Sequence, residues 1–259
     1  MGPVTPRRLL LPSVASVLGL ALLSGCSSTS TVESGDGDLL DELVAPAEGE
    51  STPTLDEQTA EVVAGEITAV DDSDVEQIVM IGDSITAGSL GPLEERFGAL
   101  GYPDTVIEAK SGKRIDVGSD ENRSGTAVAA TLLQEAEWSG DTDHTDELWI
   151  VALGTNDLGQ YPTAGEIGFA IDSLLAEVPA DAELIWIDTY IVDREADVAL
   201  VNDTIVERIA IRGDSTLAEW SEVARREGVL SSDGVHPTDI GSEVFAATVV
   251  ASAANAITN

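Results

Sequence analysis

Two segments of this sequence, far apart along the chain, carry residue types that acyl transfer needs. Ser84 follows Gly82 and Asp83, and His236 comes three positions after Asp233. A serine hydroxyl becomes a useful nucleophile when a histidine accepts its proton, and that histidine needs a carboxylate to fix its tautomer. Because Asp233 and His236 lie on one short segment, they can supply the histidine–carboxylate pair locally.

Acyl transfer also needs hydrogen-bond donors aimed at the oxyanion that develops on the substrate carbonyl. Gly112 stands in a Ser-Gly-Lys-Arg segment, and Asn156 stands in a Gly-Thr-Asn-Asp segment. The natural donors are the backbone N–H groups of Ser84 and Gly112 and the side-chain amide of Asn156. Each segment is weak evidence alone, because Gly-Asp-Ser turns and Asn-Asp pairs are common in loops. Together they indicate serine-based acyl chemistry.

The elements that must position these residues are visible as apolar runs bounded by turn residues. Strand-like runs lie at 75–81, 105–109, 147–153 and 183–187, with a weaker one at 215–220. Segments with helical spacing lie at 93–100, 125–138, 164–178, 197–212 and 239–256. Strands that alternate with helices predict right-handed crossovers and a parallel sheet covered on both faces. Such sheets bind ligands at the carboxyl ends of their strands, where most of the motifs lie.

The four motifs, in this order, resemble those of the SGNH (GDSL-type) hydrolase superfamily. Gly82-Asp83-Ser84 matches the first block, Gly112 the second, Gly154-Thr155-Asn156-Asp157 the third and Asp233-Gly234-Val235-His236 the last. The first block has Ile85 where the older four-letter name has leucine. The resemblance covers about 75–259 and implies an α/β fold. The implied architecture is a three-layer α/β/α sandwich with a flavodoxin-like sheet of about five parallel strands.

The resemblance also implies a role for each matching residue. Ser84 is the nucleophile, His236 is the general base and then the general acid, and Asp233 orients the histidine. Ser84, Gly112 and Asn156 form the oxyanion hole. The implied chemistry is that of a serine esterase or acyltransferase, with no metal ion and no organic cofactor.

Other polar residues near the motifs are expected to have structural roles. We expect Asp83 and Asp157 to brace their loops. Lys113 and Arg114 are candidates for contact with an anionic or sugar substrate, but solvated loop charges are the favoured interpretation. His144 lies in an acidic loop, and we expect it at the solvated surface because no metal-ligand spacing accompanies it.

The charge of the chain excludes whole classes of partner. The sequence has 12 basic and 48 acidic residues among 259, for a net charge of −36. Nucleic-acid binding depends on neutralising phosphates, and binding to an anionic membrane surface needs basic patches, so both are excluded. A single cysteine excludes an internal disulfide framework and a cysteine-based zinc cluster. The acidic surface favours a soluble monomer.

The N-terminus has the pattern of an export signal. Arg7 and Arg8 precede an apolar run over 9–23 that is too short and wrongly flanked for a spanning helix. The run ends in Leu-Ser-Gly-Cys, which resembles the bacterial lipobox, and Cys26 is the only cysteine of the chain. We therefore predict a signal peptide over 1–25 and a lipid anchor on Cys26, on the outer face of a bacterial cell membrane. An ordinary secretory signal with a chance cysteine is the alternative.

An acidic segment separates this signal from the folded domain. Residues 27–74 include many acidic residues and no basic one, with Ser, Thr, Gly and Pro prominent. Such a composition cannot bury enough apolar surface to offset the entropy of ordering. We predict a disordered linker over 26–74 and the hydrolase domain over 75–259. Within the linker, 58–70 has enough β-branched residues for a short strand.

The size of the domain favours small acyl groups. About 185 residues leave no room for a separate lid domain, so we predict an open, shallow site suited to short acyl groups on bulky carriers. A likeness to extracellular SGNH domains that act on O-acetyl groups points to cell-wall or other glycans. The alternatives are lysophospholipase or thioesterase action on lipids, O-acyl transfer to an alcohol, and a non-catalytic glycan-binding lipoprotein. The intact Ser84, Asn156, Asp233 and His236 argue against the last.

Overall fold

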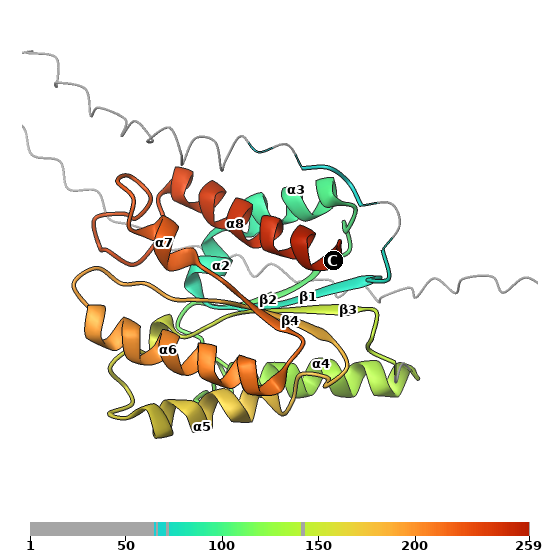
Figure 1. Ribbon diagram of the computed structural model, residues 1–259, viewed down its shortest axis with the longest axis horizontal. Helices are drawn as coiled ribbons and strands as arrows, with labels where there is room; N and C mark the ends of the chain where they lie inside the picture. The colour runs from blue at the N-terminus through green and yellow to red at the C-terminus, as the bar shows by residue number, and fades with distance from the viewer. Residues whose placement is uncertain (1–64, 66, 71–72, 141–142, 259) are drawn as a thin grey trace, which may run out of the picture. The chain divides into compact units, whose positions relative to one another are not determined.

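The computed structural model describes residues 65, 67–70, 73–140 and 143–258 (Figure 1). The predicted signal peptide over 1–25, the predicted lipidation site Cys26 and most of the predicted linker lie outside the described residues.

Five parallel strands form one sheet. They are β1 (Gln77–Gly82), β2 (Val106–Ala109), β3 (Glu147–Ala152), β4 (Glu183–Ile187) and β5 (Ser215–Ala218), in the spatial order β2-β1-β3-β4-β5. Every residue of β3 is buried, as expected for the centre of a sheet covered on both faces. The order along the sheet reverses at β1, which lies between β2 and β3. This reversal is the switch point where sheets of this kind bind ligands.

Helices cover both faces of the sheet (Figure 1). One face carries α2 (Ser84–Gly88), α3 (Leu90–Leu100), α7 (Trp220–Ala224) and α8 (Asp239–Ile257), and the other carries α4 (Gly125–Ser139), α5 (Ala164–Leu175) and α6 (Glu195–Arg212). Alternate strand residues supply two separate cores: Ile150 packs on the α3 and α8 side, and Trp149 packs on the α5 and α6 side. The predicted three-layer α/β/α sandwich is confirmed.

Helix α8 belongs to the core of this domain. It is the one helix among the described residues that is long and apolar enough to cross a membrane. In the structure, Val244, Phe245 and Val249 are buried in the core, and α8 packs against α3. Its apolar composition is accounted for by this packing.

Two short helices depart from the predicted elements. Helix α2 directly follows β1, and the Asp83 carboxylate caps it by accepting the Ile85 N–H at 2.9 Å. The weak apolar run at 215–220 is a strand only to Ala218, because Trp220 begins α7. A helix of about one turn is too short to show a helical period of apolar residues, so the sequence gives little indication of α2 or α7.

The packed part of the chain begins before the predicted boundary at Val75. Ile67 and Val70 pack against the core on the α3 and α8 side, and the Val70 N–H donates to the Leu100 carbonyl at 3.0 Å. They also line an apolar groove of about 610 Å³ with residues of those two helices. The described residues of 58–70 form no strand, and the others lie outside the described residues.

Candidate active site

Ser84, His236 and Asp233 form one chain of hydrogen bonds beyond the carboxyl end of β1. Ser84 is the first residue of α2, and its Oγ lies 3.0 Å from His236 Nε2. The other ring nitrogen, Nδ1, lies 2.7 Å from Asp233 Oδ2. Ser84 and His236 are 152 residues apart in sequence, so only the fold brings them together. Such a chain can pass the serine proton to the histidine.

The Asp233 carboxylate organises the loop that carries the histidine. Its Oδ1 accepts the backbone N–H groups of Val235 and His236 at 2.9 Å each and the Ser231 hydroxyl at 2.9 Å. The hydrogen bond from the His236 ring and these further donors hold the pKa of Asp233 well below its ordinary value of 3.8. Asp233 therefore stays ionised wherever His236 acts.

A close contact fixes this loop against the segment after β4. The Val192 N–H donates to the Gly234 carbonyl at 3.0 Å. Gly234 has a φ of +70°, and a Cβ built on it would lie 2.9 Å from the Val192 Cβ. Glycine is needed on both counts, because a side chain would be strained and would also collide.

The two backbone N–H groups predicted as oxyanion donors are unengaged. Among the described residues, neither the Ser84 N–H nor the Gly112 N–H donates to a protein acceptor. Ser84 begins a helix, where the first N–H groups have no intrahelical partner. Gly112 is exposed in the loop after β2.

Asn156 lies between these two donors, in the short 3₁₀ helix Thr155–Asp157 after β3. Its Nδ2 donates to Asp83 Oδ2 at 3.2 Å and to the Lys113 carbonyl at 3.1 Å. Asp83 precedes Ser84 and Lys113 follows Gly112, so the structure brings all three predicted donors to one place. Both distances lie within the ordinary range, so the two amide hydrogens are engaged, and one of them must be shared or exchanged for the amide to donate to an oxyanion.

Asp83 and Asp157 brace the loops around this place. The Asp83 side chain is buried, caps α2 and accepts the Asn156 amide, and burial raises its pKa to about 6. Asp157 is fully buried and accepts the Ile115 N–H and the Arg114 Nε–H, both at 3.0 Å. Burial also raises the pKa of Asp157. These contacts tie the loops after β1, β2 and β3 to one another.

The expectation that Lys113 and Arg114 are solvated loop charges is wrong. Lys113 is only 4 % exposed, and its Nζ donates to the Arg123 carbonyl at 3.2 Å. The Arg114 guanidinium pairs with Asp157 and lies 5.4 Å from the centre of the Tyr161 ring. Acceptors far along the chain compensate the buried charges, and no local pattern in the sequence reveals them.

His144 is also buried, contrary to the expected surface position. Its Nδ1 lies 3.1 Å from Glu147 Oε1, and Glu147 Oε2 accepts the Trp149 indole N–H at 2.7 Å. This network lies at the start of β3, at the opposite end of the strand from Asn156. No group of three His, Cys, Asp or Glu residues within the described ranges is arranged to hold a metal ion.

Sequence reasoning missed Asp188, which directly follows β4. Its two oxygens accept the backbone N–H and the hydroxyl of Ser221 at 2.7 and 2.6 Å, and burial raises its pKa to about 6. Asp188 and Asp83 line the same small cavity, of about 10 Å³, with the indole of Trp220. The signal was present, because an aspartate directly follows an apolar strand of the predicted sheet.

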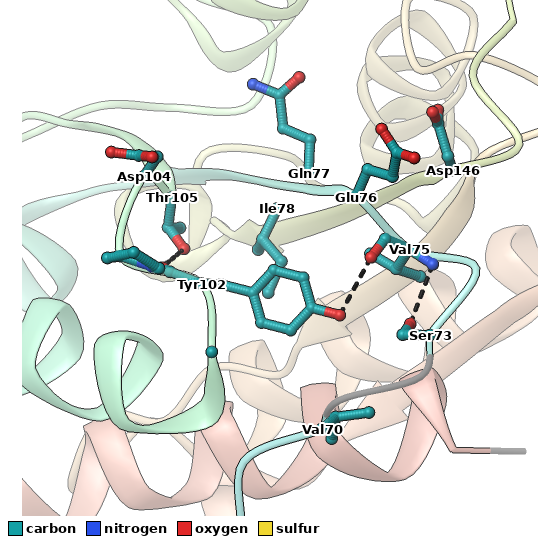
Figure 2. Close-up of a pocket in the computed structure, with 12 residues that line it drawn as sticks. Val70, Ser73, Val75, Glu76, Gln77, Ile78, Tyr102, Asp104, Thr105 and Asp146 are labelled. Carbon is teal, nitrogen blue, oxygen red and sulfur yellow. Dashed lines mark hydrogen bonds between the residues drawn. The ribbon is translucent and has the colours of Figure 1, made fainter. Parts of the chain in front are cut away.

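A larger hollow lies at the other end of the strands (Figure 2). This pocket, of about 550 Å³, is lined by the start of β1, the segment before β2 and Asp146 before β3. The Tyr102 hydroxyl crosses it to donate to the Val75 carbonyl at 3.1 Å. None of the predicted site residues lines it.

Comparison with known proteins identifies the family. The model of the GDSL-like lipase/acylhydrolase family matches residues 80–244, which run from β1 into α8. The chain belongs to this family. The GDSL-like protein is thus an SGNH hydrolase and a serine ester hydrolase, as the motifs implied. No curated protein matches the sequence.

Solved structures share the fold of this GDSL-like hydrolase at low sequence identity. The crystal structure of TesA has a TM-score of 0.52 at 17 % identity, covering 69 % of this chain and 97 % of that chain. An acetyl esterase mutant with acetate ion has a TM-score of 0.50 at 17 % identity, covering 70 % and 97 %. A member of the lipolytic protein G-D-S-L family from Veillonella parvula has a TM-score of 0.50 at 15 % identity, covering 68 % and 96 %.

Proposed function

We propose that this hydrolase removes short acyl groups, of the acetyl type, from O-esters carried by cell-wall or other glycans. The single observation that carries the mechanism is the hydrogen-bonded chain from Asp233 through His236 to Ser84, at 2.7 and 3.0 Å. In this mechanism Ser84 is the nucleophile, His236 the general base and acid, and Asp233 the orienting carboxylate.

The reaction proceeds in two halves through an acyl-enzyme. Ser84 Oγ attacks the ester carbonyl carbon while its proton passes to His236 Nε2, and the developing oxyanion accepts the Ser84 and Gly112 N–H groups and the Asn156 amide. Collapse of this intermediate breaks the ester bond, and His236 returns the proton to the leaving alcohol. A water then attacks the acyl-enzyme by the same route and releases the acid. Ionised Asp233 stabilises the imidazolium in both halves.

The preference for short acyl groups rests on the open setting of the site. The side chains of His236 and Asp233 are 48 % and 51 % exposed. The cavity that Asp83 lines has about 10 Å³, room for a water molecule and not for an alkyl chain. Each added methylene gains about 0.8 kcal/mol only where an apolar pocket receives it. The similarity in fold to an acetyl esterase is compatible with this choice.

A series of p-nitrophenyl esters tests the proposed acyl preference. We expect kcat/KM to be highest for acetate and to fall steeply beyond about four acyl carbons, because the cavity that Asp83 lines is too small for an alkyl chain. Acetate should be released into water even when a sugar alcohol is present. A preference for about eight carbons or more would overturn the proposal in favour of lipid hydrolysis, and an acetylated sugar as main product would make the protein a transferase.

We also propose that the protein acts as a lipoprotein anchored through Cys26 on the outer face of a bacterial cell membrane. The support is the sequence: a basic start, an apolar run and the only cysteine of the chain at its end. Cys26→Ser should release the protein from membranes and abolish labelling with a fatty acid. A wild-type protein recovered in the medium without acyl label would contradict the proposal.

A further inference from the structure

The loop between β2 and α4 begins with a tight turn that presents Gly112. The Lys113 N–H donates to the Lys110 carbonyl at 3.1 Å, and Gly112 has a φ of +74°. This combination is that of a type II β-turn, whose third residue needs a positive φ and is therefore usually glycine. The turn explains why glycine stands here, but a turn in which three of the four residues are exposed does not by itself hold an N–H in place.

Lys113 ties this turn to the far end of the same loop. Its side chain is buried, and its Nζ donates to the carbonyl of Arg123, just before α4. Its own carbonyl accepts the Asn156 amide at 3.1 Å. One residue thus contacts the end of the loop through its side chain and the predicted oxyanion amide through its backbone.

The turn is held from its other side by Asn122. The Asn122 Nδ2 donates to the Ser111 carbonyl at 3.0 Å and lies 3.5 Å from where a Cβ on Gly112 would be. Residue 122 therefore holds the peptide group before Gly112, and the carbonyl of residue 123 holds the side chain of Lys113 after it. Burying the Lys113 ammonium also has a cost, since burial lowers the pKa of that group, and its hydrogen bond offsets part of it.

We propose that Lys113 is a positioning residue of the oxyanion hole. By tying the turn to Arg123, its ammonium sets the place of the Gly112 N–H and of the carbonyl that orients Asn156. The role rests on the proposed esterase mechanism, in which Gly112 and Asn156 are the oxyanion donors. Such donors must be held within about 0.5 Å of their working positions. A displaced donor weakens the transition state more than the bound substrate, so the loss falls on kcat.

The test is Lys113→Met, which keeps most of the buried stem and removes the donor. With p-nitrophenyl acetate and the full chain, we expect kcat to fall about 10-fold and KM to stay within about twofold. Arg212→Met is the matched control. Arg212 also donates from a partly buried site to backbone carbonyls, those of Pro179 and Ala182, but at the amino end of the sheet. It should lower the melting temperature and leave kcat within about twofold of wild type.

A double variant separates positioning from general destabilisation. In an Asn156→Ala background the Lys113 carbonyl has no amide to orient, so the further loss from Lys113→Met should shrink to about threefold. Equal losses in both backgrounds would overturn the proposal, as would a wild-type kcat in Lys113→Met. A loss of kcat in Arg212→Met as large as that in Lys113→Met would also overturn it.

Asn122→Ala keeps the proposal testable if Lys113→Met does not fold. This partly exposed side chain holds the same turn, so kcat should fall about threefold with KM unchanged, and a wild-type kcat would overturn the proposal. Ser84→Ala tests the underlying mechanism separately. Full activity in Ser84→Ala overturns the esterase mechanism, whereas an inactive Ser84→Ala beside a normal Lys113→Met overturns only the positioning role.

Discussion

The two halves of the proposed active site are built in opposite ways. The loop of Asp233 and His236 is exposed, with about half of each of the two side chains open to solvent, and the hydrogen bonds of the Asp233 carboxylate run between residues 231 and 236. The oxyanion side is held by buried groups, and its bonds to Asn156 join residues 73 and 43 positions apart. The histidine–carboxylate pair is set by local geometry, whereas the oxyanion donors depend on how three strand ends pack.

Because of this difference, substitutions in the two halves should have different effects on activity and on the free energy of unfolding. Exposed groups on a short loop contribute little to the free energy of unfolding, so changing them should affect chemistry alone. Buried hydrogen-bonding side chains contribute both to activity and to the free energy of unfolding, because removing one leaves an unpaired polar group in the interior. The four predictions below test that separation, starting with the largest expected effect.

Removing the proposed nucleophile or the proposed base should abolish activity without unfolding the protein. For Ser84→Ala or His236→Ala we expect kcat to fall on the order of 10⁴–10⁶-fold, with an unchanged melting temperature and far-UV circular dichroism spectrum. A fluorophosphonate probe should label wild type and not Ser84→Ala. Persistent esterase activity in the alanine variant would remove Ser84 from the mechanism.

Asn156→Ala should lower kcat by roughly 10²–10³-fold with little change in KM. The reason is that, in the proposed mechanism, its amide donates to the oxyanion, which exists only in the transition state and the tetrahedral intermediate. Steady-state kinetics on p-nitrophenyl acetate measure both constants. If KM alone rises, Asn156 binds substrate and the assignment as an oxyanion donor is wrong.

Asp157→Ala should cost stability, because it leaves the Ile115 N–H and the partly buried Arg114 guanidinium without their acceptor. We expect the free energy of unfolding to fall by about 3 kcal/mol in urea titrations. The control is Glu222→Ala, which breaks an exposed pair with Arg225 and should change stability by less than about 0.5 kcal/mol. Equal losses in the two variants would contradict the distinction between buried and exposed polar groups.

Asp188→Asn should change how stability depends on pH. Burial raises the pKa of Asp188 from 3.8 to about 6, so between these values the folded protein binds more protons than the unfolded chain. The free energy of unfolding of wild type therefore falls as pH rises through this window, and the variant lacks that contribution. Relative to the variant, wild type should lose about 2 kcal/mol between about pH 4 and pH 6.5. Parallel pH profiles would mean that Asp188 does not titrate there.

The sheet, and the placement of the candidate site residues at strand ends, were predictable because their signals are local. Each central strand is a continuous apolar run, and Ser84 and Asn156 follow such runs directly. The burial of Lys113 was not predictable, because its acceptor on Arg123 lies across a loop. The His144–Glu147 pair was missed for a different reason, since an acidic loop has the composition of a solvated one.

The point where the chain enters the sheet and the candidate nucleophile Ser84 lie at opposite ends of β1. The chain reaches β1 at its amino end, where Tyr102 donates to Val75, and Ser84 lies past the other end of that strand. Six residues at about 3.3 Å each separate the two ends by about 20 Å. A group attached where the chain enters the sheet therefore lies at the far end of the sheet from Ser84.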